Sequence, residues 1–291
     1  KDETIVTAIK FVKEERREVM SDLQGKSQKA IRLGTHGEDY GSWMSNPVFY
    51  MVGGLTALAA LLAVLSFAVF HIFVPGILFV IIVAGLLALL GWITWIRRQY
   101  AFDGGRIMER VHQTILSHMD YDGKGTLLEV GCGAGALSIR AALTWQETKV
   151  VGIDYWAPVY NYSQALCEKN AVSEGAGDRC TFCRGDANKL DFPDGSFDAV
   201  VSNYVYHNIT GADKQQLLLE TLRVLKKGGV FALNDEMKPG MYGDMEAFAQ
   251  KLRDMGYEEV HLVDTAKEAF GSHRRAAMMM LGESRMLVGR K

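Results

Sequence analysis

The stretch LLEVGCGAG, residues 127–135, decides the fold of this chain. It joins an apolar, strand-like run containing Glu129 to glycines at positions 131, 133 and 135. Glycine permits the left-handed dihedrals of a tight strand-to-helix turn and lacks the Cβ that would keep a ligand away from the backbone. Residues 136–143 are expected to form a helix whose free N–H groups face the same turn. The stretch therefore predicts a binding loop for the carboxylate or phosphate of a nucleoside cofactor.

The glycine pattern by itself fits two classes of cofactor. Gly131, Gly133 and Ala136 also match the dinucleotide fingerprint, whose last position accepts alanine. A second apolar run, residues 149–154, ends in Asp154, which is placed to accept hydrogen bonds from ribose hydroxyls in either class. Two further strands are expected over residues 181–187, which end in Gly-Asp-Ala, and over residues 197–203. These last two strands carry a pattern that the dinucleotide-binding enzymes do not share.

In this order the motifs resemble those of the class I S-adenosylmethionine-dependent methyltransferases, over roughly residues 106–236. The resemblance also includes the segments FPDGSFD at 192–198 and LRVLKKGG at 222–229. It implies an α/β fold with a doubly wound, mostly parallel, seven-stranded sheet, and S-adenosylmethionine as the cofactor. Alternating strand and helix patterns across the domain agree with such a sheet.

The resemblance assigns cofactor contacts to residues at the ends of the strands. Glu129 would orient the loop and the ammonium group of the cofactor, Asp154 would take the ribose hydroxyls, and Asp186 would meet the adenine amino group. Tyr155 would flank the adenine ring, with packing as its alternative role. The residues expected to bind the cofactor are Glu129, Gly131, Cys132, Gly133, Gly135, Asp154, Tyr155, Asp186, Ala187 and Asn203.

Residues that follow the fourth expected strand are candidates for catalysis, because ligands of such sheets bind beyond the carboxyl ends of the strands. Among residues 203–208, Tyr204 and His207 could position or deprotonate a nucleophile. A neutral histidine can act as a general base near pH 7, although it could equally cap or pack the next helix. Thiolate and amine acceptors need little such help, whereas hydroxyl acceptors need a base. The sequence leaves the acceptor atom open among N, O, S and C.

Two long apolar runs precede this domain. Residues 48–70 and 77–96 contain no Asp, Glu, Lys or Arg, and each is long enough to cross a hydrocarbon core of about 30 Å. Pro75 and Gly76 predict a turn in the short connector between them. We therefore expect a transmembrane helical hairpin within residues 47–98. A hairpin buried in a soluble protein is the alternative.

Basic residues predict the orientation of this hairpin. Arg97 and Arg98 follow the second run, several lysines and arginines precede the first, and the connector has neither. The positive-inside rule then predicts an integral membrane protein with both termini and the catalytic domain in the cytoplasm. A site held at a bilayer favours a lipophilic small molecule or a lipid as acceptor. The hairpin could also pair with a second copy.

The remaining segments complete the domain organisation. Residues 1–46 are expected to form an amphipathic helix and a linker, and residues 99–291 the methyltransferase domain. A net charge of −2 gives no nucleic-acid footprint. The four cysteines have no zinc-finger spacing, so no metal site is expected. The Met-rich segment 272–281 could line the acceptor pocket or pack as a core-facing helix.

The sequence thus predicts a membrane-anchored methyltransferase that transfers a methyl group by in-line displacement. Two alternatives stay open: a nicotinamide-dependent oxidoreductase, and a membrane-tethered sensor or scaffold that binds S-adenosylmethionine without turnover. Glu129 and the Gly-Asp-Ala motif argue against the first alternative. A closed acceptor pocket would favour the second.

Overall fold

The structure is a computed structural model that describes residues 31–36, 38–41, 46–157 and 162–291. The chain divides into two compact units. The first contains residues 107–156 and 162–291 with the described part of the first 40 residues, and the second contains residues 41–106 and 157–161. The amphipathic helix expected before the hairpin falls on residues 1–30, outside the described residues.

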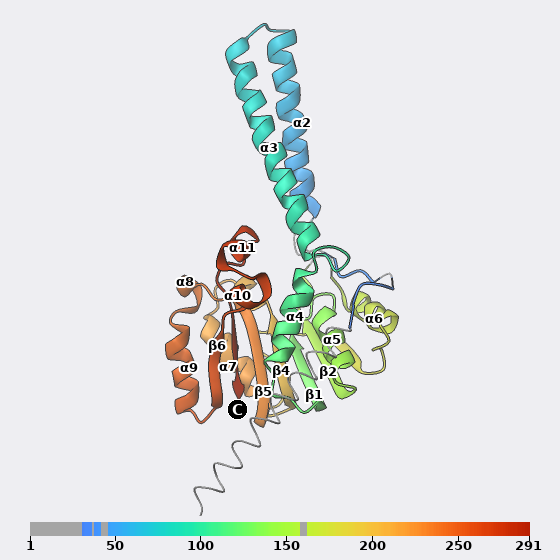
Figure 1. Ribbon diagram of the computed structural model, residues 1–291, viewed down its shortest axis with the longest axis vertical. Coiled ribbons are helices and arrows are strands. Elements are labelled where there is room, and N and C mark those ends of the chain that lie inside the picture. The colour runs from blue at the N-terminus through green and yellow to red at the C-terminus, as the bar shows by residue number, and fades with distance from the viewer. Residues whose placement is uncertain (1–30, 37, 42–45, 158–161) are drawn as a thin grey trace, which may run out of the picture. The chain divides into compact units, whose positions relative to one another are not determined.

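The first unit is built on one seven-stranded sheet with the order β3-β2-β1-β4-β5-β7-β6 (Figure 1). Five neighbouring strands, β3 to β5 in this order, pair in parallel, whereas β7 runs antiparallel to both β5 and β6. The predicted mostly parallel sheet of seven strands is therefore confirmed. The strands are β1 (Lys124–Val130), β2 (Glu147–Asp154), β3 (Cys180–Arg184), β4 (Phe197–Asn203), β5 (Leu225–Glu236), β6 (Glu258–Val263) and β7 (Ser284–Arg290).

Helices follow β1, β2 and β4 before the next parallel strand along the chain, whereas residues 185–196 join β3 to β4 without a helix. Several helices begin at a side chain that caps the first turn: Ser163 accepts from the Leu166 N–H, and Asp213 accepts from the Gln215 N–H. The helices of this unit are α4 (Ile107–Ser117), α5 (Ala136–Thr144), α6 (Gln164–Ser173), α7 (Lys214–Arg223), α8 (Pro239–Tyr242), α9 (Met245–Asp254), α10 (Thr265–Phe270) and α11 (His273–Met278).

The core follows from the two-residue period of the strands. Leu128 of β1 and Val200 of β4 join a buried cluster with Leu218 of α7 and Phe248 of α9. Their strand neighbours Leu127, Ala199 and Val201 are also buried, and alternate side chains point to the opposite face. Both faces of the central strands are therefore covered, as in a doubly wound sheet.

Strand β5 begins earlier than its apolar run predicts. The apolar run starts at Val230, whereas β5 starts at Leu225, which pairs with Phe197 of β4. The register then shifts between Phe197 and Ala199, and Gly228 has φ +79°. A glycine in this conformation allows a bulge inside a strand, so β5 continues through a sequence that resembles a turn.

The second unit contains two long helices, α2 (Asn46–Ala68) and α3 (Phe73–Tyr100), joined by residues 69–72. The prediction of two apolar helices is confirmed, but the predicted turn at Pro75 and Gly76 is wrong. Both residues belong to the first turn of α3, where proline is tolerated because its missing N–H has no intrahelical partner. The Phe67 ring packs against Gly76, where a Cβ would lie 2.6 Å from Cζ and would force the ring to shift.

The packing of α2 and α3 relies on small side chains. Ala59, Ala63 and Ser66 of α2 are buried, whereas large apolar residues such as Leu58, Leu61, Ile81 and Leu87 are exposed. Asn46 and Arg97 join the helix ends distant from the connector through a 2.8 Å hydrogen bond. Both helices are long and apolar enough to cross a membrane by length and composition.

Candidate functional site

The glycine loop after β1 has the left-handed backbone that its sequence predicts. Gly131, Gly133 and Gly135 have φ of +77°, +54° and +86°. A Cβ at position 131 would lie 2.1 Å from Cγ2 of Val205, so only glycine fits there. Gly135 caps α5 without a side-chain hydrogen bond, which leaves the first N–H groups of this helix for a ligand. The loop therefore forms a backbone cradle for an anionic or polar group.

Asp154, at the end of β2, fixes this loop. Its Oδ2 accepts from the Gly133 N–H at 2.8 Å, and its Oδ1 accepts from the Trp156 N–H at 2.7 Å. The Trp156 indole N–H donates in turn to the Gly133 carbonyl at 3.0 Å. Each carboxylate oxygen retains further lone pairs, so Asp154 can also accept hydrogen bonds from a ligand hydroxyl.

Glu129 lies buried beneath the loop in β1 and accepts a hydrogen bond from the Ser138 hydroxyl of α5. Burial raises its pKa to about 8, because a low-dielectric environment disfavours the ionised carboxylate. The Glu129 carboxyl group is therefore largely neutral at pH 7. A ligand cation beside it would favour the ionised form.

Cys132 is buried in the loop, and its backbone N–H donates to the Ile153 carbonyl at 2.9 Å. Burial raises the pKa of its thiol, so it acts as a small apolar side chain. Asn170 of α6 supports the same loop by donating to the Ala134 carbonyl at 3.0 Å. The loop is thus held from both β2 and α6.

The residues expected to meet the adenine ring lie at the ends of β2 and β3. Asp154 lies opposite Arg184 in the register of β2 and β3, and the Gly185 N–H donates to the Asp154 carbonyl at 3.0 Å. The Tyr155 ring is exposed, and the Arg184 guanidinium lies 4.7 Å from its centroid. Asp186 is exposed and accepts from the Asn188 N–H at 2.9 Å, with Ala187 next to it. These are the residues, at the carboxyl ends of β2 and β3, to which the resemblance assigns the adenine contacts.

Asn203 ends β4 beside a buried polar group that sequence reasoning missed. Its Oδ1 accepts from Nδ2 of Asn234 at 2.9 Å, and its Nδ2 lies 3.3 Å from Nε2 of His112. Burial, reinforced by the positive charge of Arg140, lowers the pKa of His112 to about 3. His112 is therefore a neutral acceptor for the Asn203 amide, which fixes how that amide is oriented.

Of the two catalytic candidates, His207 has the arrangement of a general base. Its Nδ1 lies 2.5 Å from Oδ1 of Asp235, and its backbone N–H donates to Oδ2 of the same carboxylate at 3.2 Å. Tyr242 donates its hydroxyl to Oδ2 as well, at 2.7 Å. The Asp235 side chain is almost fully buried, whereas that of His207 is 26% exposed. Asp235 thus holds the imidazole through Nδ1, and Nε2 is the ring nitrogen left for another partner.

Tyr204 is a weaker candidate for proton transfer. Its hydroxyl lies 2.6 Å from Oγ of Ser284, and burial raises its pKa above the ordinary tyrosine value. Its backbone is left-handed, with φ +55°, and its N–H donates to the Asn234 carbonyl at 3.0 Å. These contacts shape the chain between β4 and the 3₁₀ turn η2 (Tyr206–Asn208), which carries His207.

The sheet register gathers these groups at one edge. Val130 pairs with both Ile153 and Ser202, and Asn203 pairs with Asn234. The glycine loop, Asp154, the segment after β3 and the His207–Asp235 pair therefore all follow the carboxyl ends of neighbouring parallel strands. This is where a doubly wound sheet binds its ligand.

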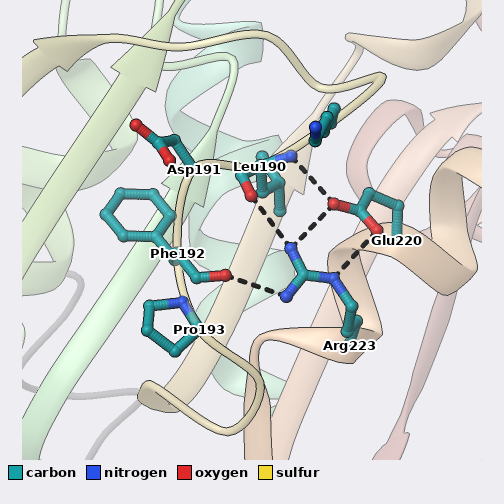
Figure 2. Close-up of a pocket in the computed structure, with 7 residues that line it drawn as sticks. Leu190, Asp191, Phe192, Pro193, Glu220 and Arg223 are labelled. Carbon is teal, nitrogen blue, oxygen red and sulfur yellow. Dashed lines mark hydrogen bonds and ion pairs between the residues drawn. The ribbon is translucent and has the colours of Figure 1, made fainter.

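A depression of about 430 Å³ elsewhere on this unit is held by structural contacts. Figure 2 shows Arg223 at its centre, where the guanidinium donates to Glu220 and to the carbonyls of Leu190 and Phe192. These bonds tie α7 to the segment before β4. The depression contains none of the residues that the sequence predicts to bind a ligand.

The Met-rich segment has features of both roles considered for it. Ala276 and Met279 are buried, whereas Arg274, Arg275, Met278 and Met280 are exposed. Ser272 caps α11 by accepting from the Arg275 N–H at 3.2 Å. One face of this segment therefore packs on the domain, and the other presents methionines and arginines to solvent.

Comparison with known proteins identifies the type of this domain. Residues 128–233 match the family model described as a methyltransferase domain. The chain is 30% identical over 151 residues to 27-O-demethylrifamycin SV methyltransferase of Amycolatopsis mediterranei, covering 52% of each protein. It is 29% identical over 143 residues to a sterol 24-C-methyltransferase of Aspergillus fumigatus, covering 49% of this chain and 36% of that protein. The chain thus spans about half or less of these relatives' lengths.

A solved structure shows the same fold. The geranyl diphosphate C-methyltransferase of Streptomyces coelicolor superposes with a TM-score of 0.50 at 14% identity, covering 64% of this chain and 80% of that one. That protein was solved in complex with Mg²⁺, geranyl diphosphate and S-adenosyl-L-homocysteine. Residues 128–233 therefore match a methyltransferase domain, and S-adenosylmethionine is the cofactor that the comparisons support.

Proposed function

We propose that this protein is a membrane-anchored, S-adenosylmethionine-dependent methyltransferase that methylates a hydroxyl group of a lipophilic acceptor. The observation that carries the proposal is the His207–Asp235 pair, which follows the same edge of the sheet as the glycine loop. The methyltransferase domain match supports the class of reaction.

The residues at this edge fit the cofactor. Gly131, Gly133 and Gly135 have left-handed backbones, and a Cβ at position 131 would meet Val205, so the shape of this backbone cradle depends on glycine. In the proposed complex Glu129 faces the ammonium group, Asp154 takes the ribose hydroxyls, and Asp186 meets the adenine amino group. Gly131, Cys132, Gly133 and Gly135 form the floor, and Tyr155, Ala187 and Asn203 complete the walls. The cofactor supplies an electrophilic methyl group when bound.

The proposed role of His207 is to remove the acceptor's proton. Asp235 holds Nδ1, so the neutral imidazole presents the lone pair of Nε2. A hydroxyl needs such a base because it is a weak nucleophile while protonated, whereas a thiolate or a neutral amine is not. The buried Asp235 carboxylate then stabilises the imidazolium that forms. A relative whose name specifies an O-demethyl substrate, the rifamycin methyltransferase, supports a hydroxyl acceptor.

The proposed membrane anchor is the pair α2 and α3. Their exposed apolar side chains would contact lipid, and their buried small residues would hold them together. Arg97 and Arg98 lie in the last turn of α3, and the connector 69–72 has no Lys or Arg, which supports both ends of the pair lying in the cytoplasm. A site held at a membrane and a sterol-methylating relative both support a lipophilic acceptor.

The test is methyl transfer in proteoliposomes. The full chain, supplied with S-adenosylmethionine carrying a labelled methyl group and a membrane lipid extract, should move label into the organic phase. His207→Asn and Asp235→Asn should each lower kcat about 10²-fold or more while leaving adenosyl affinity unchanged. Asp191→Asn, an exposed acid in the depression of Figure 2, is the matched control.

The chemical nature of the product decides the finer part of the proposal. Mass spectrometry and NMR of the labelled lipid should locate the new methyl group on oxygen. A methyl group on nitrogen or carbon would contradict the role given to His207. Adenosyl binding with no labelled product from any extract would favour a scaffold that binds the cofactor without turnover.

A further inference from the structure

A second cluster of polar side chains lies where residues 34–40 cross α6, away from the catalytic edge. The Gly34 N–H and the Tyr40 hydroxyl both donate to Oε1 of Glu174, at 2.7 and 3.0 Å. Asn170, one turn earlier, donates to the Asp39 carbonyl at 2.9 Å and accepts from the Asp39 N–H at 3.2 Å. The segment is therefore held on α6 by at least four hydrogen bonds to Asn170 and Glu174.

In each of two carboxylates of this cluster, one oxygen accepts hydrogen bonds that fix the side chain. The other oxygen lies near Nδ1 of His36. Glu174 uses Oε1 as described, and Glu38 uses Oε2 to accept from the His36 N–H at 2.8 Å. The remaining oxygens, Oε1 of Glu38 and Oε2 of Glu174, lie 3.7 and 3.5 Å from Nδ1 of His36. All three ligand atoms fall within 4.8 Å of one another.

The burial of these carboxylates calls for a positive charge. The Glu38 side chain is 0% exposed and that of Glu174 is 3% exposed. Within the described part of the chain, Oε1 of Glu38 is buried and has no hydrogen-bond partner. Two buried carboxylates repel each other, and an unpaired buried charge is costly. A cation between Glu38, Glu174 and His36 would remove both costs.

The ligand set and the spacing fit one class of cation. A tetrahedral ion with bonds of about 2.0–2.1 Å separates its ligand atoms by about 3.4 Å, close to the two distances from His36. One imidazole nitrogen with two carboxylate oxygens is a set that suits Zn²⁺ better than Mg²⁺ or Ca²⁺, which prefer oxygen ligands. The hydroxyl of Thr35, 3.3 Å from Nδ1, would give up this contact on binding.

We propose that His36, Glu38 and Glu174 bind one divalent transition-metal ion, with zinc as the best match. The ion joins residues 34–40 to α6, with the anchoring hydrogen bonds to Glu174 and Glu38 orienting both carboxylates. Asn170 on the same helix also supports the glycine loop through Ala134. The ion therefore stabilises the attachment of this segment to α6, which supports the glycine loop. It takes no part in methyl transfer.

The test measures zinc binding by the tag-free full chain in detergent after removal of metal with a chelator. Calorimetric titration should show one site per chain with a Kd below about 1 μM. Glu38→Gln and His36→Asn should each weaken it at least tenfold, as expected for loss of a ligand. Glu168→Gln, an exposed acid on the same helix that bonds only Gln164 among the described residues, is the control and should bind like the wild type.

Two further readouts distinguish zinc bound at this cluster from zinc bound by the cysteines. X-ray absorption of the loaded protein should show only nitrogen and oxygen ligands, since sulfur would mean that the cysteines hold the metal. Zinc should raise the melting temperature of the wild type and of Glu168→Gln, but not that of Glu38→Gln. Absence of saturable binding, or equal binding by Glu38→Gln, would overturn the proposal.

Discussion

In the proposed complex, Glu129 is the ionisable residue whose protonation state should respond to the bound cofactor. Its pKa of about 8 in the free protein means that it is mostly protonated at pH 7. A cofactor ammonium placed beside it adds a positive charge, which favours the carboxylate and lowers this pKa. Cofactor binding should therefore release a proton from the Glu129 carboxyl group.

This proton can be counted. Titration of the full chain with S-adenosylhomocysteine at pH 7, in two buffers that differ in ionisation enthalpy, should show release of most of one proton. Glu129→Gln should bind with little or no release, because the amide does not titrate. Equal proton release by the wild type and the variant would show that Glu129 does not face the ammonium group.

Gly131 tests whether the cradle requires backbone without a side chain. Alanine at 131 should lower adenosyl affinity at least tenfold, since its Cβ would meet Val205 at 2.1 Å. Gly175→Ala is the matched control: its φ of +75° imposes the same left-handed strain, but nothing lies within 4 Å of a Cβ there. The control should keep wild-type affinity. If Gly131→Ala bound adenosyl compounds as tightly as the wild type, the glycine loop would not be the cofactor-binding loop.

At the scale of single residues, the sequence could predict only those groups that belong to a local pattern. The glycine loop and Asp154 are recognisable because short spacing along the chain places them together. Asp235 was missed, since it follows the apolar run 230–234 and its partner His207 is distant in sequence. A carboxylate at the carboxyl end of a predicted strand was the available signal. The cluster of His36, Glu38 and Glu174 gave none, because it depends on where residues 34–40 cross α6.

Among the elements, the parallel strands were predictable because each contains a short apolar run, and most of these runs end at a glycine or an acid, although β4 ends at Asn203. The residues at which helices and strands begin and end were harder to predict. Pro75 and Gly76 have the composition of a turn, yet the helix continues through them because proline fits a first turn and Phe67 occupies the space beside Gly76. Tertiary packing, which the local pattern does not contain, decided this boundary.

The helical hairpin supplies a prediction at this scale. Gly76→Leu should force Phe67 away and lower the melting temperature in detergent by about 4 °C or more, as overpacking costs about 1–3 kcal/mol. Gly85→Leu on the same helix should have little effect, because nothing lies within 4 Å of a Cβ there. Phe67→Ala should restore stability to Gly76→Leu. Equal destabilisation by both leucines would mean that the contact with Phe67 does not hold the helices together.

For the whole molecule, the account requires the two ends of the hairpin to lie on the same side of a membrane. A fluorescent reporter that folds only in the cytoplasm should be active when fused after Lys291. An alkaline phosphatase, active only outside, should be active when inserted after His71 in the connector and inactive after Lys291. The reverse pattern would contradict the orientation that Arg97 and Arg98 predict. Cytosolic recovery of the whole chain would contradict the anchor itself.

The central claim is that this chain binds S-adenosylmethionine at the edge formed by the glycine loop and Asp154. Isothermal titration of the detergent-purified full chain with S-adenosylmethionine, S-adenosylhomocysteine and NAD tests it most directly, with Asp154→Ala in parallel. Both adenosyl compounds should bind the wild type with micromolar affinity, this binding should be lost in Asp154→Ala, and NAD should not bind. Binding of NAD alone, or adenosyl binding that Asp154→Ala leaves intact, would contradict it.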